Sequence, residues 1–144
     1  MPDLPLSGYR VVDFTANMSG PFATQILGDQ GADVVKVEAP GGDVIRTIGT
    51  GRAGMSGYFA NLNRSKRSVV VDLVSNEGRR LADQLIDSAD VVVQNFRPAV
   101  TRKLGLDGPS VRNARPGLVY AGIVGFGQHG PFAGRPAYDH VIQA

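Results

Sequence analysis

Apolar runs of strand length recur along the chain, and helix-compatible stretches separate most of them. The continuous valine runs at 69–71 and 91–93 are typical of strands that are buried on both faces. This alternation predicts an α/β fold, a Rossmann-like parallel sheet with helices on both faces. The predicted strands cover residues 10–14, 33–37, 68–73, 90–94 and 118–124.

The segment from residue 10 to residue 43 is predicted to form a βαβ unit. We expect Ser19 to cap its helix, with Gly20 and Pro21 in the first turn. A serine oxygen can accept from free N–H groups, and proline has no N–H to leave unpaired. The helix is expected to close near Gly31. Ligands of such units bind beyond the carboxyl ends of the strands.

The clearest helix is predicted over residues 76–88. Ser75 precedes it as a cap, and an apolar stripe runs along one side. We expect the stripe to consist of Leu81, Leu85 and Ile86, with Arg79, Arg80 and Asp83 on the outer side.

A long connection, residues 39–67, is rich in glycine and basic residues. Loops of this length are uncommon in compact domains and tend to be functional or mobile. We expect residues 41–62 to be mostly irregular. No repeat or linker divides the chain, so residues 1–144 are expected to form a single domain.

Composition excludes several functional classes. A net charge of +2 gives no footprint for nucleic acid, and no apolar run approaches the length of a membrane span. The first βα turn lacks G-x-G-x-x-G, and the phosphate-binding motif G-x-x-x-x-G-K-[ST] is absent. The histidines, His129 and His140, have no further ligand at suitable spacing, so no metal is expected. We expect a cytoplasmic protein without nucleic-acid or membrane partners.

Several short motifs follow one another in an order that resembles the amino-terminal part of the family III CoA-transferases. This group includes formyl-CoA transferase, carnitine CoA-transferase and α-methylacyl-CoA racemase. The resemblance covers essentially the whole chain. After the βαβ unit, the matching segments are residues 63–68 (NRSKRS), 72–73 (DL), 89–98 (ADVVVQNFRP), 104–106 (LGL), 116–120 (PGLVY), 125–128 (GFGQ) and 135–139 (RPAYD).

The resemblance implies an enzyme that moves CoA between an acyl-CoA and a carboxylic acid through an aspartyl mixed anhydride and an enzyme-CoA thioester. The nucleophilic aspartate of the family lies beyond the position of Ala144, so no catalytic nucleophile is expected in this chain. The chain is then an incomplete CoA-binding domain that is expected to be inactive alone. Full-length relatives are homodimers, and a second chain supplying the missing part is an alternative partner.

The same resemblance assigns a CoA site to the predicted strand ends. It implies that Met18 and Ser19 flank the thiol, that residues 71–74 contact the adenine, that residues 95–97 follow the pantetheine, and that Lys103 meets the pyrophosphate. The complete set of expected CoA contacts is Asn17, Met18, Ser19, Ala39, Val71, Asp72, Leu73, Val74, Asn95, Phe96, Arg97 and Lys103.

Two positions depart from the pattern. Ala39 and Val74 stand where some relatives have a basic residue for the adenosine phosphate, and Arg46, Arg64, Lys66 or Arg67 could replace those charges. Other interpretations remain open for two expected contacts. Lys103 could be a cation at a helix end, and Phe96 could be a core residue.

Tyr138 and Asp139 are expected near the acyl group without acting as nucleophile. In the racemase branch a histidine occupies the position of Tyr138, and a phenol with a pKa near 10 is poorly suited to removing an α-proton at neutral pH. A transferase is therefore favoured over a racemase. A CoA-binding domain without catalysis, or a remnant that neither binds nor reacts, is the remaining alternative.

Overall fold

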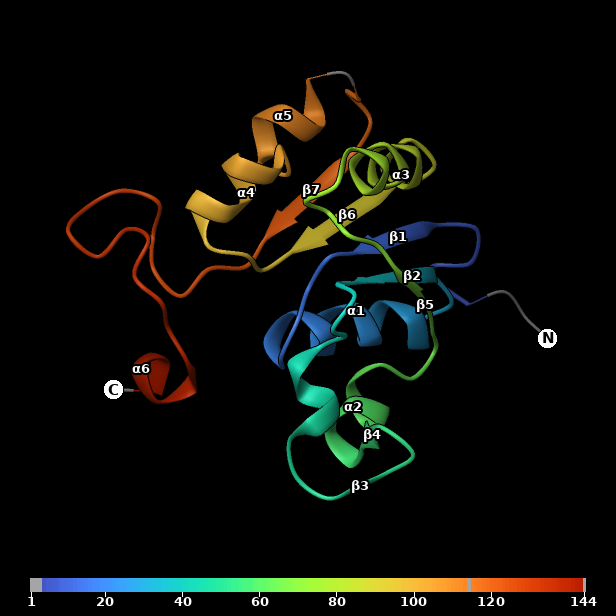
Figure 1. Ribbon diagram of the computed structural model, residues 1–144. Helices are drawn as coiled ribbons and strands as arrows, with labels where there is room; N and C mark the ends of the chain where they lie inside the picture. The colour runs from blue at the N-terminus through green and yellow to red at the C-terminus, as the bar shows by residue number, and fades with distance from the viewer. Residues whose placement is uncertain (1–3, 114, 144) are drawn as a thin grey trace.

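The computed structural model describes residues 4–113 and 115–143, and a five-stranded parallel sheet lies at its centre (Figure 1). The strand order is β5-β2-β1-β6-β7, and every neighbouring pair is parallel. This confirms the predicted fold class. The strands are β1 (Arg10–Asp13), β2 (Asp33–Glu38), β5 (Lys66–Val70), β6 (Val91–Gln94) and β7 (Val119–Gly122).

Helices cover both faces of the sheet. In Figure 1, α1 (Ser19–Asp29) and α2 (Gly57–Leu62) lie on one side, and α3 (Asn76–Asp87), α4 (Pro98–Leu104) and α5 (Gly108–Arg112) lie on the other. Alternate residues along the strands contribute side chains to two separate hydrophobic cores. Val12 and Val92 join the core under α3 to α5, whereas Val11 and Val93 join the core beside α1. Burial of β6 explains the valine run at 91–93. The run at 69–71 lies at the end of the edge strand β5, where Val70 is 60% exposed, so the predicted burial on both faces was wrong for this run.

The start of α1 differs from the prediction. Ser19 is its first helical residue, Met18 occupies the N-cap position, and no side chain caps the helix. Gly20 is needed there because a Cβ atom at this position would lie 2.3 Å from the Thr15 Cβ atom. The end agrees with the prediction: the helix stops at Asp29, and Gly31 adopts a φ of +101° that favours glycine.

In α3, Ser75 is the N-cap, and its oxygen accepts from the Gly78 N–H group, as predicted. The predicted apolar stripe was partly wrong. Ala82 and Ile86 are buried, whereas Leu81 is exposed on the surface. Arg79 is half-buried, so its placement on the outer side was also wrong.

The connection between β2 and β5 is structured rather than irregular, which corrects the expectation for residues 41–62. It contains a 3-10 helix, η1 (Val44–Thr47), the hairpin strands β3 (Gly51–Arg52) and β4 (Met55–Ser56), and α2. Polar side chains fix these turns. The Asp43 carboxylate caps η1, and the Ser56 hydroxyl caps α2 while it donates to the Ile45 carbonyl at 2.6 Å.

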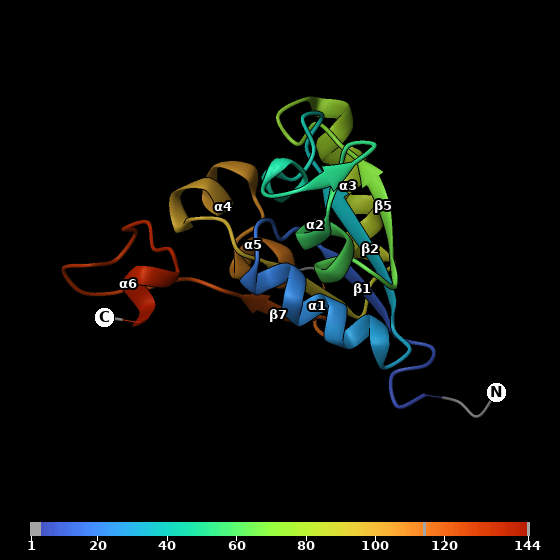
Figure 2. The ribbon, with the colours of Figure 1, turned by 90° about the horizontal axis from the view of Figure 1, so that it is seen from below.

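The carboxyl-terminal arm leaves β7 and ends in α6 (Asp139–Gln143), which stands away from the sheet in both views (Figures 1 and 2). Within the part of the chain that the structure describes, no helix has the length and apolar character needed to cross a membrane.

Candidate functional site

The carboxyl ends of the parallel strands meet at one edge of the sheet, as the sequence predicted. Within this edge, β1 and β6 are neighbours, but the chain continues from them in opposite directions along the sheet. Such a reversal of strand order opens a crevice between the two loops, and ligands of α/β sheets bind in it. The loops at this switch point begin at Phe14 and Asn95.

Asn95 links the two loops directly. Its Oδ1 atom accepts from the Ala16 N–H group at 2.9 Å, and its Nδ2 atom donates to the Ala16 carbonyl at 2.7 Å. Asn95 was expected to follow the pantetheine. That contact stays a prediction, and the structure shows that the Asn95 side-chain amide is bonded to the backbone of the neighbouring loop.

The loop after β1 is held by a buried ion pair. Lys36 Nζ lies 2.9 Å from Asp43 Oδ2 and donates to the Thr15 carbonyl at 2.8 Å, while Asp43 Oδ1 accepts from the Asn17 N–H group. Asn17 adopts a φ of +66°, a left-handed conformation that asparagine tolerates better than most residues. This sharp turn leaves Met18 half exposed at the edge, and the following residue, Ser19, exposed.

A second buried ion pair anchors the base of the same loop. Lys66 Nζ lies 3.0 Å from Asp13 Oδ2, and both side chains are almost completely buried. Asp13 also accepts from the Thr24 hydroxyl at 2.6 Å and from the Thr15 N–H group at 2.8 Å. Burial lowers the pKa of Lys66, and the Asp13 charge opposes this shift. The pair ties β5 to β1 and α1.

Glu38, at the end of β2, organises the connection that follows. It accepts two hydrogen bonds from the Arg46 guanidinium, both at 2.7 Å, and one from the Ser68 hydroxyl at 2.6 Å. Burial opposes ionisation of Glu38, but these donors and the Asp43 N–H group outweigh it and lower the pKa to about 2. The Arg46 guanidinium also stacks over Phe59.

The four basic residues considered as replacement phosphate ligands all have carboxylate partners. Arg46 pairs with Glu38, Arg64 with Asp29, Lys66 with Asp13 and Arg67 with Asp33. Lys66 is buried, so it cannot reach a ligand at the surface without breaking the core. The structure thus gives no support to any of these four as the replacement cation.

A hollow of about 390 Å³ lies between α3 and α4, beside the loop that follows β5. It is lined by Leu73, Val74, Asn76, Arg79, Lys103 and Leu104. Three of the expected CoA contacts are thus brought together here. Arg79 was missed from the sequence, although a basic residue one turn into a helix that follows a predicted ligand loop was a usable signal.

The other expected CoA contacts occupy different environments. Val71 is buried in the core, so only its backbone can face a ligand, whereas Ala39 is exposed at the end of β2. Asp72 accepts from the Val74 N–H group and shapes its own turn. Phe96 packs partly against the core, which agrees with its alternative interpretation as a core residue, and Arg97 is exposed beside it.

Tyr138 and Asp139 are not brought to the other candidates. Tyr138 is exposed and precedes α6, and α6 begins at Asp139, away from the sheet edge. Their place near an acyl group stays a prediction.

A shallow hollow of about 480 Å³ lies over the β3–β4 hairpin and α2, between Arg52 and Ala60. No group of three or more histidine, cysteine, aspartate or glutamate side chains in the described part of the chain could hold a metal ion.

Comparison with known proteins gives a family and several relatives. The family model for CoA-transferase family III matches residues 6–144. A probable fatty acyl-CoA transferase of Mycobacterium tuberculosis is 45% identical, over 99% of this chain and 37% of that protein. A succinate–glutarate CoA-transferase of Agrobacterium fabrum is 44% identical, over 96% and 37% respectively. The crystal structure of a CAIB/BAIF family protein from Brucella suis matches with a TM-score of 0.92 at 43% identity, over 98% of this chain and 39% of that one. This chain therefore spans little more than a third of these relatives.

Proposed function

This chain belongs to CoA-transferase family III, and we propose that it supplies the CoA crevice of an enzyme that moves CoA between an acyl-CoA and a carboxylic acid. The observation that carries the proposal is the hollow between α3 and α4, which brings together Leu73, Val74 and Lys103, three residues expected to contact CoA. Apolar walls suit the adenine, and a cation at the rim suits a phosphate.

The switch point supplies the other half of the crevice. Seven residues of α4 separate Arg97 from Gly105, and at the helical rise they span about 10 Å. An extended pantetheine arm can follow this distance from the hollow to the loop after β1. Met18 and Ser19 are exposed there and would face the thiol end.

The proposed chemistry is nucleophilic catalysis by a carboxylate. The carboxylate of the family's nucleophilic aspartate, which lies outside residues 1–144, attacks the thioester carbonyl of the acyl-CoA, and the CoA thiolate leaves. The thiolate attacks the aspartyl carbonyl of the mixed anhydride, which expels the first acid and gives an enzyme-CoA thioester. The acceptor carboxylate then attacks this thioester and releases the thiolate again. The thiolate attacks the acceptor's carbonyl in the new anhydride, which forms the new acyl-CoA and regenerates the aspartate.

In this proposal the residues of this chain bind and orient. The loop from Thr15 to Ser19 holds the thiolate near the carbonyl between successive steps, and the Asn95 and Lys36 side chains keep that loop in place. Holding a leaving group close to its next target converts a bimolecular step into an intramolecular one. Tyr138 and Asp139 complete the acyl pocket.

The relatives are named for fatty acyl and for succinate–glutarate reactions, so the proposal is stated for their shared class of substrates, an acyl-CoA and a carboxylic acid. We further propose that the enzyme is cytoplasmic. It works as a homodimer, or together with a second chain that carries the aspartate. The transferase is preferred to a racemase because Tyr138 is poorly suited to proton abstraction.

The test is to incubate the chain with a panel of acyl-CoA donors and acid acceptors, alone and with a polypeptide that corresponds to the remaining part of a family III relative. Hydroxylamine traps an aspartyl anhydride as a hydroxamate. We expect turnover only with the added polypeptide, and a hydroxamate on an aspartate in it. Turnover by residues 1–144 alone, with a hydroxamate mapped inside them, would contradict the proposed division of roles.

A further inference from the structure

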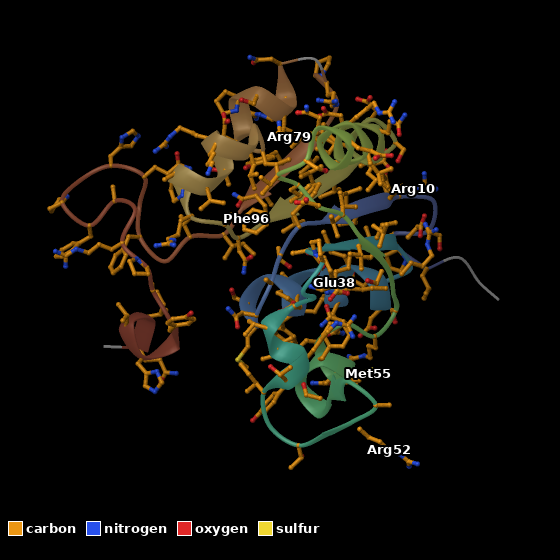
Figure 3. The ribbon with its side chains drawn as sticks, in the orientation of Figure 1. Arg10, Glu38, Arg52, Met55, Arg79 and Phe96 are labelled. Atoms are coloured by element: carbon orange, nitrogen blue, oxygen red, sulfur yellow. The ribbon has the colours of Figure 1, made fainter. Side chains whose placement is uncertain are left out.

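Arg79 is a half-buried cation that faces the hollow between α3 and α4 (Figure 3). It extends from α3 to the carboxyl end of α4, where Gly105 makes room for it. A Cβ atom on Gly105 would lie 2.6 Å from Arg79 Nη2. Gly105 also ends α4 with a φ of +61°, so the same glycine terminates the helix and admits the guanidinium.

Arg79 has no carboxylate partner among the described residues, and neither has Lys103 on the other side of the hollow. Glu77 and Asp83, the acidic residues nearest to Arg79 along the chain, form no ion pair with it, and Asp83 lies 4.0 Å from Arg115. The next acidic residues are also placed otherwise. Asp72 caps its own turn through the Val74 N–H group, and Asp107 accepts from Ser110. A partly desolvated guanidinium without an anion is unfavourable, and its five N–H donors match the oxygens of a phosphate group.

The remaining walls of the hollow are suited to a flat heterocycle. Leu73 and Leu104 pack against the core from either side, and Val74 is 81% exposed at the rim. Two cations therefore flank an apolar surface. The adenosine end of CoA has the complementary arrangement, because its ribose carries a 3′-phosphate on one side and the pyrophosphate on the other.

Resting on the proposed function, we propose that Arg79 binds the 3′-phosphate of CoA, and that it makes this site selective for CoA over 3′-dephospho-CoA. Lys103 then holds the pyrophosphate, which both ligands contain. Arg79 is thereby a specificity-determining residue, and its contribution is separable from that of Lys103 by the choice of ligand.

The experiment is calorimetric titration of CoA and of 3′-dephospho-CoA into the wild-type chain and into Arg79→Met. We expect the wild type to prefer CoA by about 10- to 100-fold, the value of a charge-assisted hydrogen bond to phosphate. Arg79→Met should lose this preference by binding CoA more weakly, with the affinity for 3′-dephospho-CoA little changed. Arg79→Lys should retain part of the preference for CoA, because lysine keeps the positive charge but lacks the planar, forked donors of the guanidinium.

Two controls isolate the contact. Arg80→Met removes the same charge from the next position on α3, which is exposed and does not line the hollow. This variant should leave both affinities within about twofold, since screened surface charges contribute little. Lys103→Met should weaken both ligands by the same factor. Circular dichroism and thermal unfolding check each fold, and Arg79→Gln replaces Arg79→Met if the latter does not fold.

The outcomes separate this inference from the proposed function. A wild-type chain that binds neither ligand would overturn the CoA crevice itself. A chain that binds CoA, but in which Arg79→Met and Arg79→Gln weaken both ligands equally or neither, would overturn only the assignment of Arg79 to the 3′-phosphate.

Discussion

Asn95 and Ala16 are joined by two hydrogen bonds across the switch point, one in each direction, at 2.9 and 2.7 Å. The side-chain amide of Asn95 makes the two hydrogen bonds to the Ala16 backbone that a neighbouring strand would make, although Ala16 lies in a loop outside the sheet. Because β1 and β6 end side by side, this contact sets the distance between the two loops that border the crevice.

Asn95→Ala should therefore lower the free energy of unfolding by about 1–3 kcal/mol, since it leaves the Ala16 N–H and C=O groups without their partners. Asn95→Asp should be intermediate, because it retains the acceptor and loses the donor. Urea unfolding measures both effects. Unchanged stability in Asn95→Ala would show that water replaces the amide without loss.

The strands were predictable from sequence because each is a short apolar run with its own local signal. The run at 68–73 gave the most shifted boundary: β5 begins at Lys66 and ends at Val70. The polar first residue of β5 was not predicted to lie in a strand, because Lys66 is buried by an ion pair with Asp13, 53 positions earlier in the chain. An ion pair between such distant positions leaves no periodic pattern in the local sequence.

The candidate site was predictable at the level of the sheet edge and not at the level of side chains. The parallel fold alone places the strand ends together. The partner of Asn95 and the surroundings of Arg79 depend on how α3 and α4 pack and on the order of the strands, which the local pattern does not encode. Ser19 failed as a cap for a similar reason, because close contact between Gly20 and Thr15 sets the entry to α1.

Glu38 should make the stability of the fold depend on pH in acid. Its pKa is about 2 in the folded chain against an ordinary value of 4.5. A carboxyl with a depressed pKa contributes stability above its unfolded pKa and loses it as pH falls through its folded pKa. The contribution is about 3 kcal/mol at neutral pH, lost between about pH 4.5 and pH 2.

The measurement is urea unfolding of the wild type and of Glu38→Gln at several pH values. Glu38→Gln should be less stable by about 2–3 kcal/mol at pH 7, and the difference should shrink as the pH approaches 2. Other carboxylates with lowered pKa values, Asp29 and Asp33 among them, act equally on both proteins. A difference that is constant with pH would contradict the role given to Glu38.

Lys66 should be far more important for stability than the adjacent Arg67, although both form ion pairs. Lys66→Met leaves the buried Asp13 carboxylate uncompensated, which costs about 3–5 kcal/mol. Arg67→Met removes a pair whose arginine is 65% exposed, which costs less than about 1 kcal/mol.

The double variant Lys66→Met with Asp13→Asn separates charge from shape. It should be more stable than the sum of its two single changes predicts, because neither partner is left as an unpaired buried charge. Additive losses in urea unfolding would show that Lys66 and Asp13 act independently.

Gly78→Ala should destabilise the protein even though alanine is the better helix former. In an exposed helix interior this change gains about 1 kcal/mol. At Gly78, in the first turn of α3, the new Cβ atom would lie 1.9 Å from the Asp72 carbonyl oxygen, and a backbone atom cannot move aside as a flexible side chain does. Relief requires α3 to shift away from the turn at Asp72, where the Ser75 cap also bonds. We expect a net loss of about 1–3 kcal/mol, typical of overpacking, and a weaker affinity for CoA because Leu73 and Arg79 move with the turn and the helix.

Gln84→Ala, on the exposed side of the same helix, is the matched control and should change stability by less than about 0.5 kcal/mol. A Gly78→Ala variant as stable as the wild type in urea, with unchanged CoA affinity, would mean that α3 has room at Asp72 that the structure does not give it.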